Sequence, residues 1–411
     1  MACALFAGVL LALHGGALRF PFLADDYFFY DETRPGSVWS PTEAISLTEN
    51  YFRPVGRELY FFVLSRVFGP HPLLFHLFNL AVLLACLGLV FALAKRLLGT
   101  RAAVLALAAY ALLYSHRVLL AWVSCAQDLL AAALGFGAAL LYVRGARGRA
   151  ALVFGIGLFA KESIAALPLL LLVWEAWRAR GRARWRARLA GAFRQTLPLW
   201  IVAVAWVGIV LGVRTLSHAW LKAGEALPVA DVVLRPSSLW LGLKLALLTY
   251  VCLDQPLSYL ADAARHVALP ALAIGLAVAA ALLLRWTPAG SSRTEPRAAS
   301  GWKLGLLWAV VGALPVSLVG HHYSAYYVCF SSVGFALAAG WLLARWPLPA
   351  TAAVLALAAW ASVVANGVQP FRIAREIEEK PGVSYVSMAR LEWQRKFVDS
   401  LHDALAADPP P

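Results

Sequence analysis

Long runs of apolar residues, separated by short polar segments, dominate the chain. A transmembrane helix needs about 17–25 mainly apolar residues. Several stretches reach or approach that length without any Asp, Glu, Lys or Arg: residues 2–18, 71–94, 195–213, 267–284, 304–320, 323–344 and 346–371. Shorter apolar stretches lie at 102–115, 129–143, 150–160, 163–174 and 237–253. The pattern predicts an all-α, polytopic transmembrane helical bundle of about 11–13 membrane helices.

Basic residues are concentrated in short segments between the apolar stretches. Segments 95–101, 144–149 and 178–194 contain Lys or Arg and no acid. Because cytoplasmic loops of membrane proteins carry an excess of Lys and Arg, we expect these segments on the cytoplasmic side. By alternation, the opposite side receives residues 19–70, 116–128 and the Lys161–Glu162 region.

The second half of the chain is less regular. We expect one segment within 214–253 to be re-entrant or interfacial, which puts the basic loop 285–303 on the cytoplasmic side and the C-terminal tail outside. In the alternative, 237–253 is an ordinary span and the loop 285–303 lies on the extracytoplasmic side. We therefore divide the chain into a transmembrane domain, residues 1–371, whose first extracytoplasmic loop is 20–70 and carries short interfacial helices, and a polar tail, 372–411. Within the tail, 387–405 has an amphipathic pattern typical of a helix on the membrane surface or docked on the protein body.

Composition agrees with a membrane protein. The chain is 61% hydrophobic and 14% charged, against about 45–50% and about 25% in soluble domains. The net charge of +14 would indicate nucleic-acid binding in a soluble chain, but here most of it lies between apolar runs, so we expect no nucleic-acid partner. The five cysteines lie in or at the ends of apolar segments without metal-ligand spacing, and we expect them to be buried thiols.

Two adjacent acids follow the first apolar stretch. Asp25 and Asp26 stand in the segment Phe20-Pro-Phe-Leu-Ala-Asp-Asp-Tyr27, followed by further aromatic residues. Adjacent residues cannot share one helix face, so at most one carboxylate points into a given site. The other would orient it, bind a cation or face water. A solvated helix start is the alternative, and Tyr27 suits either a membrane interface or a sugar ring.

Arg53 and Arg57 are four residues apart in the segment Tyr51-Phe-Arg-Pro-Val-Gly-Arg-Glu-Leu59, so that an α-helix would place both on one face. The planar guanidinium group suits phosphate oxygens. An interfacial helix that meets lipid head groups is the alternative. His76 and Asn79 likewise share a helix face, where a hydrogen bond between helices is the simpler interpretation.

Three further polar groups interrupt apolar sequence. Gln127 and Asp128 could hydrogen-bond an acceptor, hold the arginines of the first loop or cap a helix. Lys161 and Glu162 lie between apolar segments that are each too short to span comfortably, and charged groups at such positions are candidate functional groups. We interpret Lys161 as a phosphate ligand and Glu162 as the residue that positions it. The adjacent His321 and His322 could meet a phosphate, but no third ligand at recognisable spacing supports zinc.

These groups can all lie on the non-cytoplasmic side. A carboxylate that faces several cations is what group transfer from a phosphate-linked donor requires, because the cations neutralise the leaving phosphate while the carboxylate accepts the proton of the acceptor. No P-loop or GxGxxG motif is present.

The ordered set of these motifs resembles the C-type (GT-C) superfamily of integral-membrane glycosyltransferases, and within it the protein O-mannosyltransferase-like group. The motifs are Asp-Asp-Tyr, Tyr-Phe-Arg-Pro, Pro-Leu-Leu-Phe-His-Leu-Phe-Asn, Ala-Trp-Val-Ser-Cys-Ala-Gln-Asp, Leu-Phe-Ala-Lys-Glu-Ser and His-Tyr-Ser-Ala-Tyr-Tyr. The resemblance covers residues 20–175, with weaker similarity to 345.

The resemblance implies a polyprenyl-phosphate-linked sugar as donor, an inverting transfer on the extracytoplasmic face of the plasma (inner) membrane, and a protein, lipid or envelope-glycan acceptor. It further implies a carboxylate of the Asp25/Asp26 pair as base, preferably Asp26, and contacts of Arg53, Lys161 and one of the two histidines with the lipid phosphate. A divalent cation, Mg²⁺ or Mn²⁺, at Asp25/Asp26 is left open.

The chain departs from the family pattern at Cys125-Ala-Gln127, where relatives often have Gly-Arg before the acid, and the acceptor is therefore undefined. Two other classes stay as alternatives: a transporter or flippase of lipid-linked sugars, and a non-catalytic envelope-assembly membrane protein. A transporter would be expected to show paired broken helices in two similar halves, whereas the polar groups here lie mainly in the first half.

Overall fold

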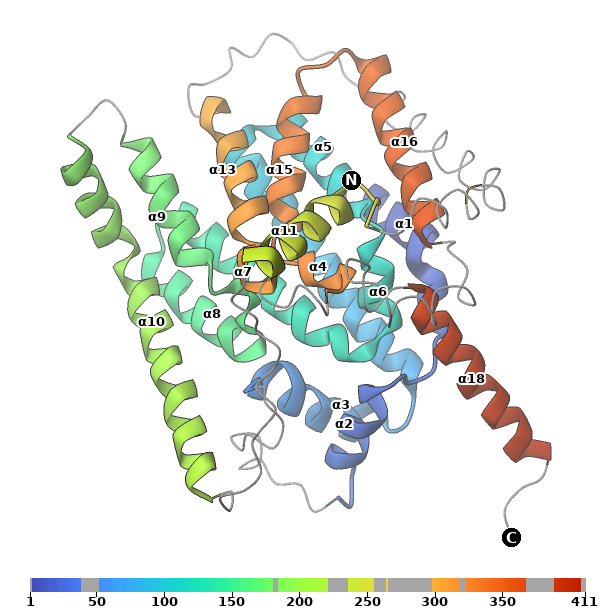
Figure 1. Cartoon of the computed structure of the whole chain (residues 1–411). Coiled ribbons are helices and arrows are strands. Elements are labelled where there is room, and N and C mark those ends of the chain that lie inside the picture. Colours follow the sequence, from blue (N-terminus) through green and yellow to red (C-terminus); the bar gives the residue numbers. More distant parts are fainter. Residues whose placement is uncertain are drawn as a thin grey trace.

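The computed structural model describes residues 2–37, 52–179, 184–220, 236–254, 264, 298–317, 323–366 and 388–407, and every structural statement below refers to these residues. They form helices without a β-strand (Figure 1). The α-helices are α1 Ala2–His14, α2 Asp25–Thr33, α3 Tyr60–Phe68, α4 Pro72–Leu98, α5 Thr100–Ala111, α6 Ser115–Ala121, α7 Ala126–Val143, α8 Arg147–Ala160, α9 Leu167–Arg178, α10 Trp185–Trp220, α11 Pro236–Tyr250, α13 Ala298–Val311, α14 Leu314–Ser317, α15 Ser332–Leu343, α16 Leu348–Asn366 and α18 Met388–Ala407. Short 3-10 turns are η1 Gly15–Arg19, η4 Val123–Cys125, η5 Glu162–Ile164 and η7 Ala325–Val328, and η3 Pro54–Leu59 is a π-helical turn.

The all-helical prediction is confirmed for the described part of the chain. Four helical segments there are long and apolar enough to cross a membrane: Pro72–Leu98, Val123–Val143, Trp185–Val213 and Leu348–Asn366. A fifth results if α5 and α6, which meet at a bend of 57°, count as one span. The predicted spans 2–18, 237–253, 304–320 and 323–344 correspond to shorter apolar helices, and the predicted span 267–284 lies outside the described residues.

Small residues allow the central helices to pack closely. A Cβ atom on Gly334 of α15 would lie 2.2 Å from the backbone nitrogen of Ala309 on α13. On the other side of α15, a Cβ atom on Gly340 would lie 2.5 Å from the carbonyl oxygen of Ala102 on α5. Contacts of this kind, in which glycine lets two backbones approach, are typical of helix association in membranes.

The two ends of the bundle differ in charge. Helix α4 ends just after Lys95 and Arg96, α7 ends before Arg144, and α9 ends at Arg178. The polar motifs lie at the other ends of these helices. Helix α7 begins at Ala126, directly before Gln127 and Asp128, and α8 begins at the basic Arg147 and ends before Lys161. In Figure 1 the end of α9 and the start of α10 lie at the top and helices α2 and α3 lie at the bottom. Basic segments and polar motifs thus occupy opposite ends.

The amphipathic segment of the tail forms α18 and contacts the body through its first half. Leu391 is buried, Glu392 forms an ion pair with Arg117 of α6 at 3.4 Å, and Arg395 lies 5.4 Å from the centre of the Phe20 ring. The side chains from residue 399 to 404 are exposed, and the end of α18 projects away from the bundle (Figure 1).

Candidate functional site

The acidic pair lies at the start of α2, and its two members differ in environment. Asp26 is fully buried, whereas Asp25 is exposed. Both carboxylate oxygens of Asp26 accept hydrogen bonds: Oδ1 accepts from the backbone nitrogen of Ser124 at 2.7 Å and from its hydroxyl at 2.5 Å, and Oδ2 accepts from the backbone nitrogens of Leu23 at 3.0 Å and Val123 at 3.3 Å. Asp26 therefore ties the start of α2 to η4.

Burial raises the pKa of Asp26 to about 7, although the hydrogen bonds from Ser124, Leu23 and Val123 act in the opposite direction. Burial also raises the pKa of Asp25, and the positive charge of Arg57 opposes this shift. The guanidinium group of Arg57 lies 5.1 Å from the centre of the Phe29 ring, three residues after Asp26 on α2.

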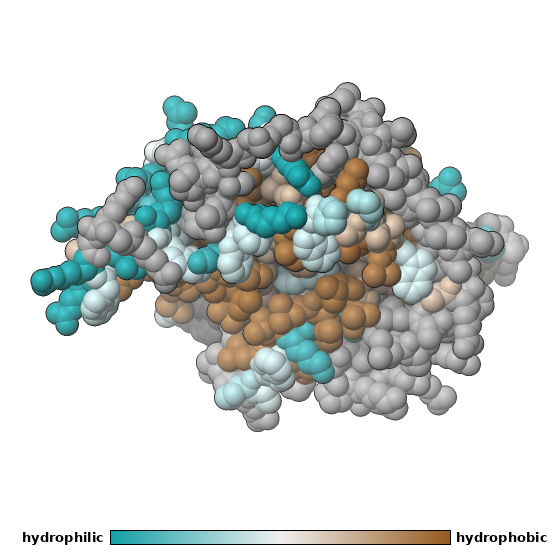
Figure 2. Space-filling view, turned by 90° about the horizontal axis from the view of Figure 1, so that it is seen from above, coloured by the Kyte–Doolittle hydropathy of each residue, from teal (hydrophilic) through white to brown (hydrophobic). Residues whose placement is uncertain are grey.

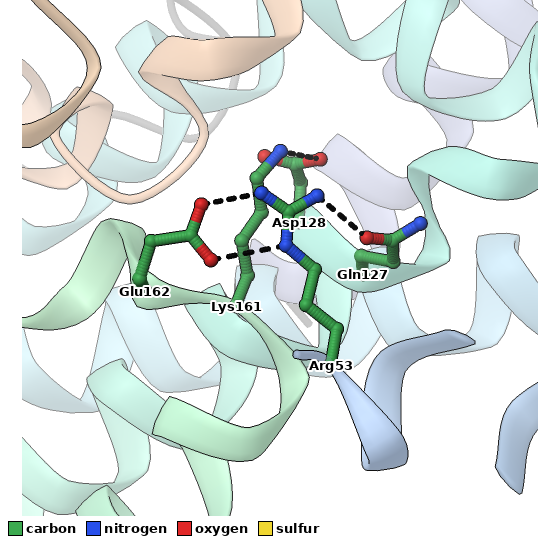
Figure 3. Close-up of polar contacts among 5 residues, drawn as sticks. All are labelled: Arg53, Gln127, Asp128, Lys161 and Glu162. Carbon is green, nitrogen blue, oxygen red and sulfur yellow. Dashed lines mark hydrogen bonds and ion pairs between the residues drawn. The ribbon is translucent and has the colours of Figure 1, made fainter. Parts of the chain in front are cut away.

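Arg53 connects three segments that are far apart in the sequence (Figure 3). Its Nε donates to Oε2 of Glu162 at 3.0 Å and its Nη2 donates a shorter bond to Oε1 of the same carboxylate, which makes the contact bidentate. Its Nη1 donates to Oε1 of Gln127 at 2.9 Å. The sequence left several roles open for Gln127, and in the structure it holds an arginine of the first loop.

Lys161 lies beside Arg53 and forms a second ion pair. Its Nζ donates to Oδ2 of Asp128 at 2.8 Å, and both side chains are buried (Figure 3). The same ammonium group lies 5.1 Å and 5.0 Å from the ring centres of Tyr326 and Tyr327 in η7, a distance at which cation–π attraction operates. We call Arg53, Gln127, Asp128, Lys161 and Glu162 the charged cluster.

The exposure of Glu162 distinguishes it within the charged cluster. Its side chain is 42% exposed, against 12% for Arg53, 7% for Lys161 and 3% for Asp128. Burial alone would raise the pKa of Glu162, but the charge and hydrogen bonds of Arg53 and the charge of Lys161 outweigh it and lower the pKa to about 2. The low pKa means that Glu162 is ionised at neutral pH. Its exposure means that Glu162 forms the side of the charged cluster that is accessible to a ligand.

A glycine explains how Arg53 reaches this position. A Cβ atom on Gly56 would lie 2.4 Å from the carbonyl oxygen of Ala160, the last residue of α8. Only glycine lets η3 rest on the end of α8, directly before Lys161. The π-helical turn also separates the two arginines: Arg57, which a regular α-helix would align with Arg53, is buried and pairs with Glu58 instead.

His76 and Asn79 of α4 form hydrogen bonds to the backbone segments that carry Asp26 and Ser124. The ring nitrogens of His76 lie 2.6 Å from the carbonyl oxygen of Leu120 and 2.9 Å from that of Phe20. Asn79 donates to the carbonyl oxygen of Val123 at 3.1 Å and accepts from the hydroxyl of Tyr60 at 2.9 Å. These are the hydrogen bonds between helices that the spacing favours, and they fix the backbone on both sides of the Asp26–Ser124 contact.

The other residues singled out in the sequence contribute less. Tyr27 is 44% exposed and packs edge-on against Phe22, and His321 and His322 lie outside the described residues. No group of three or more His, Cys, Asp or Glu side chains that could hold a metal ion occurs within the described residues. Both oxygens of Asp26 accept hydrogen bonds, from four donors in all, so the exposed Asp25 is the carboxylate of the acidic pair that a divalent cation could reach.

Sequence reasoning missed the residues that complete the site. Ser124, which anchors Asp26, belongs to a recognised polar segment but carries no signal of its own. Glu58, Tyr326 and Tyr327 become partners of Arg57 and Lys161 only through tertiary contacts. A second buried pair, the hydroxyl of Tyr114 donating to Asp254, was not anticipated either.

The charged cluster and the acidic pair are neighbours. Ser124 of η4 bonds Asp26, and Gln127 and Asp128 follow three and four residues later in the first turn of α7. In an α-helix this spacing is a rise of about 4.5–6 Å. Comparison with known proteins found no matching protein-family model, no matching curated protein and no matching solved structure.

Proposed function

We propose that the protein is a C-type membrane glycosyltransferase, which transfers a sugar from a polyprenyl-phosphate-linked donor to a protein, lipid or envelope-glycan acceptor with inversion. The observation that carries the proposal is the placement of the charged cluster, in which Arg53 and Lys161 lie side by side within an apolar bundle, close to an acidic pair. Buried charges within a membrane bundle are costly and are typically retained for function.

The proposal includes a topology. We propose a bundle of about 11–13 membrane helices in the plasma (inner) membrane, with the site on the extracytoplasmic face. The opposite placement of the basic segments 95–101, 144–149 and 178–194 supports this orientation, because basic loops favour the cytoplasmic side.

We place the donor phosphate beside Glu162, on the accessible side of the charged cluster. At rest each cation has a carboxylate partner, Arg53 with Glu162 and Lys161 with Asp128, and these contacts orient both side chains in apolar surroundings. As the bond between the sugar and the phosphate breaks, negative charge develops on the leaving phosphate, and the two preorganised cations stabilise it. His321 and His322 directly precede Tyr323, whose ring centre lies 6.1 Å from that of Tyr327, and we keep them as candidate phosphate ligands.

We assign the general base to Asp25 rather than to Asp26. The oxygens of Asp26 accept four hydrogen bonds, whereas the side chain of Asp25 is exposed next to it. In the proposed step the acceptor oxygen attacks the anomeric carbon, its proton passes to the Asp25 carboxylate, and the bond from that carbon to the phosphate oxygen breaks, releasing polyprenyl phosphate. Asp26 positions Asp25 by fixing the first turn of α2 to Ser124.

The experiment uses the full-length protein in lipid nanodiscs with a panel of radiolabelled polyprenyl-phosphate sugars. Donor binding and the release of polyprenyl phosphate are measured separately. We expect Arg53→Gln to weaken donor binding, and Asp25→Asn to leave binding intact while slowing transfer by about 10²–10⁴-fold, the usual contribution of a general base.

Arg66→Gln is the matched control. Arg66 lies at the same end of the protein, but its guanidinium group donates to the carbonyl oxygen of Thr33 and lies over the Phe62 ring. Its replacement should change neither readout. Transfer that persists in Asp25→Asn would refute the assigned base. Failure to bind any donor would refute the proposal. In a parallel assay with the protein in sealed liposomes, movement of an intact donor across the bilayer would favour a transporter.

A further inference from the structure

The basic end of the bundle carries a stack of tryptophans and cations from three helices. The Nζ of Lys303, on α13, lies 5.5 Å from the ring centres of both Trp177 on α9 and its neighbour Trp302. The ring of Trp302 in turn lies 5.1 Å from that of Trp341 on α15, centre to centre. Arg345 follows α15 and places its guanidinium group 3.4 Å from the centre of the Trp341 ring. We call these five residues the tryptophan–cation stack.

Charge in this region is strongly one-sided. Within α9, α13 and α15, Glu175 is the only acidic residue, and it is paired with Arg178 at 3.2 Å. Arg178 lies over the ring of Trp174 at 4.7 Å, which continues the arrangement along α9. Among the residues that the structure describes, Lys303 and Arg345 form no ion pair. Arg345 donates instead to the backbone carbonyl oxygen of Trp341 at 2.8 Å. The stack therefore presents positive charge beside aromatic rings.

Figure 2 looks down on this end of the bundle. Hydrophilic residues extend from the side where α9 and α10 lie toward the middle of the face, where they adjoin residues of intermediate hydropathy and strongly apolar ones. A surface that is apolar, aromatic and cationic side by side matches the chemical order of a phospholipid, from acyl chain through glycerol to phosphate.

We infer that the tryptophan–cation stack binds the headgroup of an anionic phospholipid in the leaflet on the basic side. Lys303 and Arg345 meet the phosphate, and the indole rings lie at the depth of the glycerol backbone, where tryptophan is enriched in membrane proteins. An ordinary aromatic belt consists of separate anchors. Here the rings of Trp177 and Trp302 share Lys303, and the ring of Trp341 links Trp302 to Arg345, so the stack is a defined binding site. The inference depends on the membrane location alone and stands apart from the proposed transferase activity.

The test measures lipid binding to the full-length protein in nanodiscs of phosphatidylcholine to which phosphatidylglycerol is added. We expect the wild-type protein to retain phosphatidylglycerol in preference to phosphatidylcholine, as read by native mass spectrometry and by titration with a fluorescent analogue. Each Lys or Arg near an anionic membrane contributes about fivefold to binding, so Lys303→Gln with Arg345→Gln should weaken phosphatidylglycerol binding about thirtyfold. Lys303→Arg should retain it.

Arg147→Gln is the matched control for Arg345→Gln alone, because each removes one positive charge from the basic end. Arg147 begins α8 and donates to Oε1 of Gln195, outside the stack. A loss of binding in Arg147→Gln equal to that in Arg345→Gln would mean that only overall charge matters. The absence of a preference for phosphatidylglycerol in the wild type would mean that no such site exists. Either result would overturn the inference. Thermal unfolding in pure phosphatidylcholine verifies that the variants are folded, and Arg345→Gln alone, at an exposed position, tests the site if the double variant is unstable.

Discussion

The hydroxyl of Ser124 donates a hydrogen bond of 2.5 Å to Oδ1 of Asp26, a residue 98 positions earlier in the chain. This contact joins the first turn of α2 to η4, from which α7 continues with Gln127 and Asp128. The acidic pair and the charged cluster are thus attached to the same short segment of backbone, and the geometry of one depends on the other.

Replacing Ser124 by alanine should remove the contact that couples the acidic pair to the charged cluster. The variant loses one hydrogen bond to a buried carboxylate, a loss of about 1–3 kcal/mol in the free energy of unfolding, and the pKa of Asp26 should rise above about 7 because a stabilising donor is gone. Thermal unfolding and the rate of sugar transfer are the measurements. Ser65→Ala is the control: its hydroxyl is buried and donates to the carbonyl oxygen of Thr33, so stability should fall while transfer is kept.

The pH dependence of stability should reveal the buried Asp26. Its pKa is about 7 in the folded protein and about 4 in an unfolded chain. Between these values the folded state keeps a proton that the unfolded state has lost. The contribution of Asp26 to stability is therefore full below about pH 4, falls by up to about 1.4 kcal/mol per pH unit as the pH rises to about 7, and is constant above that.

The measurement is the apparent melting temperature of the wild type and of Asp26→Asn from pH 4 to 8. The difference between the two proteins should change across this range and level off above about pH 7. A constant difference would show that Asp26 titrates normally and that its burial has little electrostatic effect.

Gly56→Ala should separate η3 from α8. The added methyl group would lie 2.4 Å from the carbonyl oxygen of Ala160, and because this atom belongs to the backbone, the turn must move. We expect a loss of about 1–3 kcal/mol and, since Arg53 moves with the turn, weaker donor binding. Gly88→Ala on α4, where nothing lies within 4 Å of the new atom, should leave both unchanged. Equal effects of the two substitutions would contradict the packing argument.

Lys161 and Asp128 allow structural and functional roles to be separated. Lys161→Met leaves the carboxylate of Asp128 buried without its cation, and removal of one partner of a buried pair typically lowers stability by about 3–5 kcal/mol. The double variant Lys161→Met/Asp128→Asn should recover most of this stability, because no uncompensated charge remains. If Lys161 binds phosphate, donor binding should stay weak in the double variant. Recovery of both properties would assign the pair a structural role only.

Much of the site could be recognised as a set of unusual residues but not as a set of contacts. Lys161 and Glu162 stand out because they interrupt apolar sequence, yet their partners, Asp128 and Arg53, are 33 and 109 residues away. The sequence favoured Asp26 over Asp25 as the base from a resemblance alone. Only burial distinguishes the two, and burial depends on where η4 lies.

The prediction of helices had a similar limit. Apolar runs located most of the described helices, because each must bury or expose to lipid a largely apolar surface. The short runs 150–160 and 163–174 became α8 and α9, which extend to Arg147 and Arg178. Composition could not reveal that the break between them holds Lys161 and Glu162 beneath η3.

The sequence by itself determined that the chain forms helices long and apolar enough to cross a membrane, and that basic residues are concentrated in short segments between them. Apolar runs of membrane length and segments that contain Lys or Arg without acids are local properties of the sequence and can be read without knowing any tertiary contact. Tertiary structure decided the pairing of Arg53 with Glu162, of Lys161 with Asp128 and of Asp26 with Ser124. These choices depend on close approach between distant segments, such as Gly56 against Ala160, and the energy of a buried charge depends on which group it meets there.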